Sequence, residues 1–222
     1  ATAMAILKSL LQLLYRSIRD FFVRYKHYIT LKLRCRGKAR FNTTTRIDVT
    51  SIFEGANVIG DNTRFSGNMG YGSYICNDCS IIGNIGRFTS IAADVKNAQG
   101  VHPVEYPYAT TSPMFFSLKK QSGITFAKKQ LFEEMRSPIN IGNDCWIGQR
   151  VFFVGGLTIG DGAVIGAGAV VSKDIPPYAI AVGSPIRIIR YRMTEEQIAA
   201  MQRIQWWNWD DERLQEVEKM FE

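Results

Sequence analysis

The sequence contains few of the residues that build metal sites and disulfide frameworks. Only two histidines, His27 and His102, and four cysteines occur among 222 residues. Cys76 and Cys79 are spaced as C-x-x-C, but no second pair follows, so we expect no zinc site. We expect Cys79 and Cys145 to be small core residues, and scattered free thiols are typical of a reducing cytosol.

Long apolar runs are also lacking. None reaches the roughly 18 residues that a membrane-spanning helix needs. The N-terminus has neither the charged start nor the small-residue cleavage site of a secretory signal. We expect Met4 to be the natural start of the protein, with residues 1–3 left by cloning. These absences favour a cytoplasmic protein over a transmembrane or secreted one.

Acidic residues are scarce in the N-terminal part. Up to Arg46 there are 11 Lys or Arg and one acid, Asp20, which gives this segment a charge of +10, whereas the rest of the chain carries −3. From residue 5 to about 28, apolar residues recur three and four positions apart without Gly or Pro, which predicts an amphipathic helix.

This basic helix has two interpretations. It packs on the end of the main domain or on a neighbouring subunit, or it lies on an anionic membrane surface through residues 5–40. A nucleic-acid partner is not expected, because no known nucleic-acid-binding motif accompanies the positive charge.

Residues 141–176 repeat with a period of six. Every hexad begins with an aliphatic or aromatic residue, and its fifth position is apolar. The first positions are Ile141, Ile147, Phe153, Ile159, Ile165 and Val171. A period of six fits neither an amphipathic helix nor simple strand alternation, so each hexad is a short strand followed by a turn. The repeat predicts a parallel β-helix, whose coils bury their inward side chains against one another.

A less regular tract of the same kind runs from about residue 47 to 96. Its phase slips within residues 65–75 and again within 81–85. These slips predict bulged corners or a small protruding turn around residues 68–73.

The repeat is absent from residues 97–138. Some forty residues are too many for a loop that only connects two strands, and functional residues often lie in long loops that leave a regular scaffold. This excursion contains His102.

The C-terminal part predicts two helices. Thr194 and Gln197 form a capping box that begins a helix ending near Gln205, and Asp210 caps a second helix. The expected organisation has three parts. They are a basic amphipathic helical segment (1–46), a β-helix domain (47–190) with the excursion 97–138, and a C-terminal helical segment (191–222).

Several motifs resemble those of the hexapeptide-repeat acyltransferases. They are Asn143-Asp144-Cys145-Trp146-Ile147-Gly148, the hexads from Ile159 to Ala167, Ser172-Lys173-Asp174-Ile175-Pro176-Pro177-Tyr178, and Gly183-Ser184-Pro185. Two further motifs are similar to the xenobiotic acetyltransferase branch, which includes streptogramin and chloramphenicol acetylating enzymes and many polysaccharide O-acetyltransferases. These are His102-Pro103 with Thr111-Ser112-Pro113, and Trp206-Trp207-Asn208-Trp209. The resemblance covers about residue 47 to the C-terminus and leaves out the basic helix.

The resemblance implies an all-β fold, a left-handed parallel β-helix, assembled as a homotrimer with acetyl-CoA as acyl donor between adjacent subunits. It implies that His102 is the general base that takes the proton of an acceptor hydroxyl. Trp146 would line the thioester end of the CoA channel, although an aromatic at a coil corner serves packing equally well. Gly148, Gly166 and Ala167 would let pantetheine approach the backbone, or they are simply the small residues that tight corners need.

The nucleotide end of CoA is expected near three cations that follow the last coil, Lys173, Arg187 and Arg190. CoA phosphates are bound well by fixed cations, while solvated surface charges are the alternative. Direct transfer requires neither a metal nor a nucleophilic cysteine.

The expected function is acetyl-CoA-dependent O-acetylation of a sugar hydroxyl, in surface polysaccharide or its lipid-linked precursor. The basic helix is the reason to expect a glycan acceptor, because a membrane-bound acceptor explains why positive charge is concentrated at one end of the chain. The protein would then lie on the inner face of the cytoplasmic membrane. Alternatives are acetylation of an antibiotic and a non-catalytic β-helix scaffold. A zinc hydratase of the γ-carbonic-anhydrase kind is disfavoured, since it needs three histidines.

Overall fold

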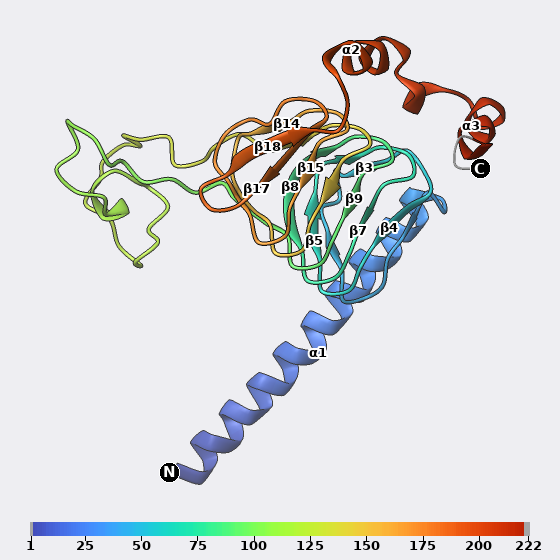
Figure 1. The fold of residues 1–222 in the computed structure, drawn as a ribbon. Helices are drawn as coiled ribbons and strands as arrows, with labels where there is room; N and C mark the ends of the chain where they lie inside the picture. Colours follow the sequence, from blue (N-terminus) through green and yellow to red (C-terminus); the bar gives the residue numbers. More distant parts are fainter. Residues whose placement is uncertain (1, 220–222) are drawn as a thin grey trace.

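The computed structural model describes residues 2–219 as a three-sided parallel β-helix with a long N-terminal helix, a looped excursion and C-terminal helices (Figure 1). Three sheets form its sides, and the strands of successive coils pair in parallel except for the antiparallel pair β17–β18. The predicted parallel β-helix is therefore confirmed.

We call the three sides A, B and C. Side A consists of β1 (Ala39–Arg40), β4 (Asn57–Ile59), β7 (Tyr74–Ile75), β9 (Ser90–Ile91), β12 (Trp146–Ile147), β15 (Val164–Ile165), β17 (Ala179–Val182) and the antiparallel β18 (Arg187–Tyr191). Side B consists of β2 (Arg46–Ile47), β5 (Arg64–Ser66), the first half of β8 (Ser80–Ile85), β10 (Lys96–Ala98), β13 (Phe152–Val154) and β16 (Val170–Val171). Side C consists of β3 (Ile52–Phe53), β6 (Asn68–Met69), the second half of β8, β11 (Ile139–Ile141) and β14 (Thr158–Ile159).

The core is a set of columns that run along the β-helix axis. On side A, each inward residue pairs with the inward residue of the next coil, and all of them are buried. This column is Ile59, Ile75, Ile91, Ile147 and Ile165. Full burial of each such side chain contributes roughly 1.5–3 kcal/mol, so the columns supply most of the driving force for folding.

Two cysteines lie in this core. Cys79 and Cys145 are each 2% exposed. Burial raises the pKa of the Cys79 thiol to about 11 and that of Cys145 to about 12. The thiolate is the reactive form, so both are inert at neutral pH, and their predicted role as core residues is confirmed.

The coils have two lengths. Tyr74 pairs with Ser90, 16 positions later, whereas Trp146 pairs with Val164, 18 positions later. In the shorter coils the chain passes from side B to side C in four positions, as from buried Phe65 to buried Met69.

The predicted protruding turn around residues 68–73 is therefore wrong. Residues 68 and 69 form β6, which lies within side C. A slip in a six-residue repeat indicates either an insertion or a deletion, and here the chain loses two residues per coil.

Gly67 makes the four-residue step possible. Its φ of +142° is one that residues with a side chain rarely adopt, and an added Cβ would lie 1.8 Å from the carbonyl oxygen of Gly83 in the next coil. The backbones of successive coils are in direct contact at this corner.

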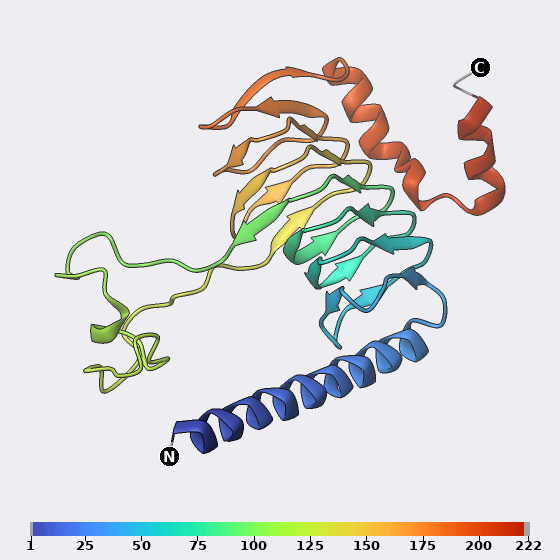
Figure 2. The same ribbon diagram turned by 90° about the horizontal axis from the view of Figure 1, so that it is seen from below.

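Helix α1 (Thr2–Cys35) is longer than the predicted helix at residues 5–28. Its C-terminal end closes the β-helix, where Leu31 and Cys35 join the core and Tyr28 packs edge-on against Phe41 at 5.7 Å. Figure 2 shows α1 crossing this end of the coils and continuing beyond them. The packing interpretation is correct for this end of the helix. Among residues 2–219, no helix has both the length and the apolar character needed to cross a membrane.

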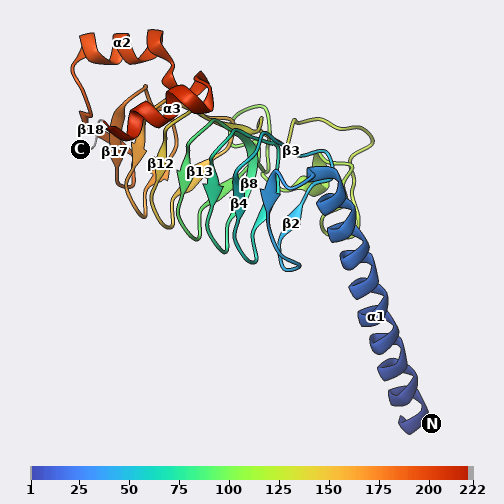
Figure 3. The same ribbon diagram turned by 90° about the vertical axis from the view of Figure 1, so that its right-hand side faces the viewer.

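The C-terminal segment follows its predicted caps. Thr194 and Gln197 make both capping-box hydrogen bonds of α2 (Glu195–Ile204), and Asp210 caps α3 (Asp211–Glu218). Between them lies a short 3-10 helix, η2 (Trp206–Asn208). These helices lie along one edge of the coils (Figure 3). The rest of the predicted segment, residues 220–222, lies outside the described residues.

Replacing Gly67 with Ala is expected to lower the free energy of unfolding by about 2–3 kcal/mol, because the methyl group must displace the backbone of the next coil. Gly123→Ala is the matched control, since Gly123 also has a positive φ (+85°) but nothing lies within 4 Å of its added Cβ. The control should lose only about 1 kcal/mol. Chemical denaturation measures both, and equal losses would contradict the proposed contact.

Candidate functional site

The predicted site residues lie at different corners of the triangular coil. The excursion leaves the β-helix after β10 on side B and returns at β11 on side C, so it occupies the B–C corner. Gly148, Gly166 and Ala167 follow strands of side A and precede strands of side B, so they lie at the A–B corner. The C-terminal segment covers the remaining C–A corner.

The base of the excursion is held by hydrogen bonds between its two limbs. The amide of Val101 donates to the carbonyl of Glu134 at 2.9 Å, and the amide of Arg136 donates to the carbonyl of Gln99 at 2.8 Å. His102 directly follows this pairing and is therefore positioned at the root of the excursion.

The orientation of the His102 ring is fixed by one hydrogen bond. Nδ1 lies 2.7 Å from the carbonyl oxygen of Thr111, and the ring packs edge-on against buried Phe116 at 6.1 Å. A carbonyl oxygen only accepts, so Nδ1 carries the proton, and Nε2 of the neutral imidazole has a free lone pair. The side chain is exposed, so Nε2 is accessible to an acceptor.

A buried carboxylate organises the rest of the excursion. Glu134 is 7% exposed and accepts hydrogen bonds from Gln121 at 2.6 Å and Gln130 at 2.5 Å, with the ammonium of Lys119 at 3.8 Å. Hydrogen bonding from Ser117 is the main cause that lowers the pKa of Glu134. Because the fold favours the ionised form, this stabilisation is complete above the ordinary glutamate pKa and is lost as the pH falls through the lowered one.

Trp146 and the small residues lie next to one another at side A and the A–B corner. Trp146 lies on the outer face of side A between Ser90 and Val164, and it is 58% exposed. The amide of Gly148 donates to the carbonyl of Ile165, directly before Gly166. The structure therefore brings together Trp146, Gly148, Gly166 and Ala167.

The glycines at this corner have a steric role. A Cβ on Gly148 would lie 2.6 Å from the amide nitrogen of Ala167, and one on Gly166 would lie 2.7 Å from a methyl group of Val182. Close coil stacking is thus sufficient to explain both glycines.

The three predicted cations do not form one cluster. Lys173 follows β16 at the B–C corner, the corner of the excursion. Arg187 and Arg190 lie on β18, opposite Val182 and Ile180 of β17. All three side chains are exposed. Within one chain, the excursion with His102 and the surface around Trp146 thus occupy different corners.

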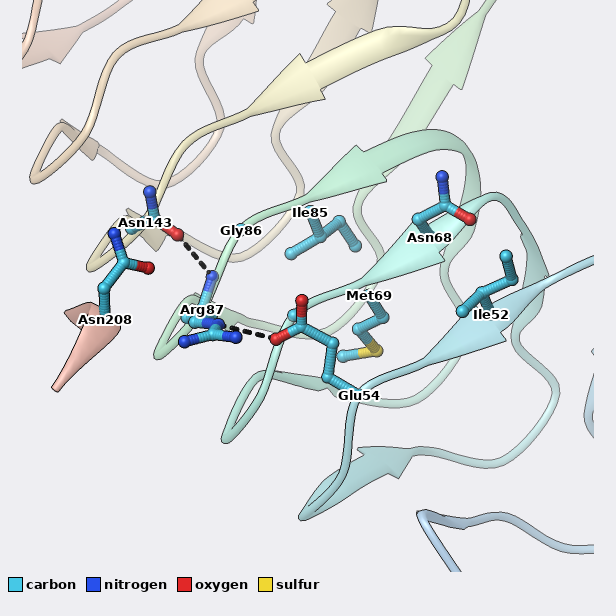
Figure 4. Close-up of a pocket in the computed structure, with 10 residues that line it drawn as sticks. Ile52, Glu54, Asn68, Met69, Ile85, Gly86, Arg87, Asn143 and Asn208 are labelled. Carbon is cyan, nitrogen blue, oxygen red and sulfur yellow. Dashed lines mark hydrogen bonds and ion pairs between the residues drawn. The ribbon is translucent and has the colours of Figure 1, made fainter. Parts of the chain in front are cut away.

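The C–A corner contains a pocket that the sequence did not indicate (Figure 4). Its volume is about 430 Å³, and Glu54 and Arg87 form an ion pair across it at 2.6 Å. Partial burial acts to raise the pKa of Glu54, but hydrogen bonds from Arg87 and from the amide of Tyr71 lower it overall. Arg87 also donates to the carbonyl of Trp207, which ties the C-terminal segment to this corner.

A second ion pair holds the same segment further along the corner. Arg192 donates to Asp144 at 3.0 Å, and Gln202 donates to Asp161 at 3.2 Å. Burial is the main cause that raises the pKa of Asp144, although Arg192 opposes it. These contacts explain the acidic residues in the predicted hexads as anchors for the C-terminal helices. Within residues 2–219, no group of three or more His, Cys, Asp or Glu side chains could hold a metal ion.

Comparisons with known proteins identify the family. The family model "Bacterial transferase hexapeptide (six repeats)" matches residues 138–173. A probable macrolide acetyltransferase from Lysinibacillus sphaericus is 35% identical over 130 residues, which cover 59% of this chain and 71% of that protein. The chain belongs to the hexapeptide-repeat acyltransferases.

Two further known proteins are similar to this chain. A chloramphenicol acetyltransferase from Klebsiella aerogenes is 36% identical over 131 residues, covering 59% of this chain, and the chain spans 61% of its length. A solved N-acyltransferase from Bacillus cereus, in complex with a dideoxy-amino sugar nucleotide and coenzyme A, has a TM-score of 0.54 at 17% identity over 78% of this chain and 95% of that one. The predicted left-handed parallel β-helix is confirmed as the fold.

Glu134→Ala is expected to loosen the excursion, because Gln121 and Gln130 lose their shared buried acceptor. Limited trypsin digestion reports this directly, since Lys128 and Lys129 lie within the excursion. Cleavage there should become several times faster. Glu105→Ala, an exposed carboxylate of the same excursion, should leave the rate unchanged, and equal rates for the two variants would contradict the role of Glu134.

Proposed function

We propose that this protein is an acetyl-CoA-dependent O-acetyltransferase that acts on a hydroxyl of a sugar, with His102 as general base. The observation that carries the proposal is the hydrogen bond from Nδ1 of His102 to the carbonyl of Thr111 at 2.7 Å, which leaves Nε2 as proton acceptor. The names of the relatives, acetyltransferases with 35–36% identity, support acetyl transfer.

The proposed reaction needs no covalent intermediate on the protein. Nε2 takes the proton of the acceptor hydroxyl as its oxygen attacks the thioester carbonyl, and the imidazolium then returns the proton to the departing thiolate. The C–S bond breaks and a C–O bond forms, which yields an acetyl ester and free CoA. The buried thiols have raised pKa values and take no part.

The proposed site is shared between copies of the chain in a homotrimer. His102 and Trp146 occupy different corners of one coil, so a neighbouring copy is needed to bring a B–C corner to an A–B corner. The exposed aromatic side chains of the excursion support this arrangement, since such a surface is usually covered by a partner. They include Tyr106 at 97% exposure and the stacked pair Phe115 and Phe126.

For the donor, we propose that acetyl-CoA lies along Trp146, Gly148, Gly166 and Ala167. The backbone at exposed Ala167 and half-buried Gly166 is accessible to pantetheine amides, and Trp146 presents a flat apolar surface beside it, whereas Gly148 is buried and contributes only by being small. We propose that the CoA phosphates are bound by Lys173, Arg187 and Arg190. Each of these cations would come from the subunit that lies next to the nucleotide end of CoA.

For the acceptor, we propose a sugar of surface polysaccharide or its lipid-linked precursor, at the inner face of the cytoplasmic membrane. The support comes from α1, on which an apolar stripe of Leu7, Leu11, Leu14, Ile18 and Phe21 is exposed. Basic residues flank the stripe, as in helices that lie on anionic membranes. Figures 1 and 2 show the projecting half of α1 and the excursion on the same side of the β-helix, so a membrane there faces the site.

Acetylation of an antibiotic is the second candidate. This candidate is favoured by the names of two relatives, a chloramphenicol acetyltransferase and a probable macrolide acetyltransferase. The two candidates differ in the acceptor alone: free drug would be acetylated without a membrane in one case, and a glycan in the other.

His102→Ala is expected to reduce turnover at least about a hundredfold with the fold intact, because the acceptor loses its general base. Release of CoA thiol is measured against a panel of sugars, glycans and antibiotics, and thermal unfolding verifies the fold. A variant as active as its parent would refute the assignment.

Mixed oligomers test whether the site is shared. His102→Ala and Trp146→Ala variants are each expected to have low activity, but unfolding and refolding them together in equal amounts should restore about a quarter of the sites if each site takes one residue from each of two copies. A mixture that stays as inactive as its components would place both residues of a site on one chain.

Vesicle co-sedimentation tests the membrane proposal. Leu11→Gln with Ile18→Gln should weaken binding to phosphatidylglycerol vesicles at least about a hundredfold, because two apolar side chains are lost from the stripe. Ser9→Gln with Ser17→Gln leaves both stripe and charge unchanged and should bind like the parent. Equal binding by all three proteins would remove the membrane argument.

A further inference from the structure

A large groove lies where α1 diverges from the first coil. Its volume is about 850 Å³. One wall is the underside of α1, with Phe21, Arg24 and Tyr28, and the other is the segment from Phe41 to Arg46. The groove thus lies at the A–B corner of the first coil, at the opposite end of the β-helix from β18.

The groove carries positive charge from arginine side chains that form no ion pair among the described residues. Arg46 pairs with Arg64 on the neighbouring strand, so two guanidinium groups extend from adjacent positions of side B. Nε of Arg24 donates a hydrogen bond to the carbonyl oxygen of Asp20 at 3.2 Å. Among the described residues, no carboxylate lies within 4.0 Å of the guanidinium groups of Arg24, Arg46 or Arg64. Like charges side by side are unfavourable unless an anion joins them.

Aromatic side chains line both walls of the groove. Tyr28 and Phe41 pack edge-on, and Phe21 stacks with Tyr25 at 6.1 Å. Thr43 and Thr44 also line the groove. An aromatic lining next to cations and hydroxyl-bearing residues matches a ligand with a hydrocarbon part and an anionic head.

The groove is also continuous with the apolar stripe of α1. Phe21 belongs to both, and Tyr25 extends the stripe along the groove. A hydrocarbon chain that leaves a membrane beneath the stripe therefore enters the groove without crossing a polar surface. Figure 2 shows α1 diverging from the first coil toward its N-terminus.

We propose that this groove binds one anionic phospholipid, with its phosphate between Arg24 and Arg46 and an acyl chain along Phe21, Tyr28 and Phe41. The lipid fills the groove and fixes the angle between α1 and the β-helix. This proposal is independent of acetyl transfer, because it concerns the other end of the molecule and its readout is lipid binding.

Native mass spectrometry of the full chain, released from detergent with added phosphatidylglycerol, tests the proposal. One lipid per chain is expected to remain bound. Arg24→Gln with Arg46→Gln should lower retention at least about tenfold, through loss of two charge-assisted contacts to phosphate. Lys8→Gln with Arg16→Gln removes the same charge from α1 outside the groove and should retain the lipid.

Three outcomes would overturn the proposal. Equal retention of phosphatidylcholine would show that the head group is not recognised, and equal binding of inorganic phosphate would indicate a free-anion site. Absence of a lipid adduct, together with a changed oligomeric mass in Arg24→Gln with Arg46→Gln, would assign the groove to a second copy of the chain. None of these results depends on whether the protein acetylates a sugar.

Discussion

The structure depends on the stacking of inward side chains from coil to coil. Each column, such as Ile75 on Ile91, is in register along the whole β-helix, so a coil cannot gain a residue on a side without disrupting its neighbours. Additions are tolerated only where the chain turns. The long excursion accordingly leaves at a corner, between Ala98 and Ile139, and the coils before and after it stack as if it were absent, with Ile85 directly beside Ile141.

This constraint gives each corner its own role. The B–C corner carries the excursion with His102, the A–B corner carries the small residues beside Trp146, and the C–A corner is covered by the C-terminal helices through Arg87 and Arg192. A rigid triangular cross-section separates these features within one chain. The separation is the physical reason why the proposed site needs more than one copy.

The sequence was sufficient to predict whatever depends on periodicity and local chemistry. The hexads predicted the β-helix and the buried cysteines, and Thr194 and Asp210 predicted where two helices begin. It could not predict the four-residue step at Gly67, because a phase slip does not reveal whether residues are added or removed. The ion pair of Glu54 and Arg87 joins residues 33 positions apart in sequence that meet only after two coils are stacked. The contact of His102 with Thr111 likewise depends on how the excursion closes.

The antiparallel strand β18 ends the β-helix in a way that bears on solubility. A bare last coil would present an unpaired edge to which another β-helix could add, and repeated addition would build a filament. β18 pairs with this edge on side A in the opposite direction and places Arg187 and Arg190 on it. At the other end, α1 covers the first coil through Leu31 and Cys35. The first coil and the side A edge of the last coil are thus both protected against the addition of another β-helix.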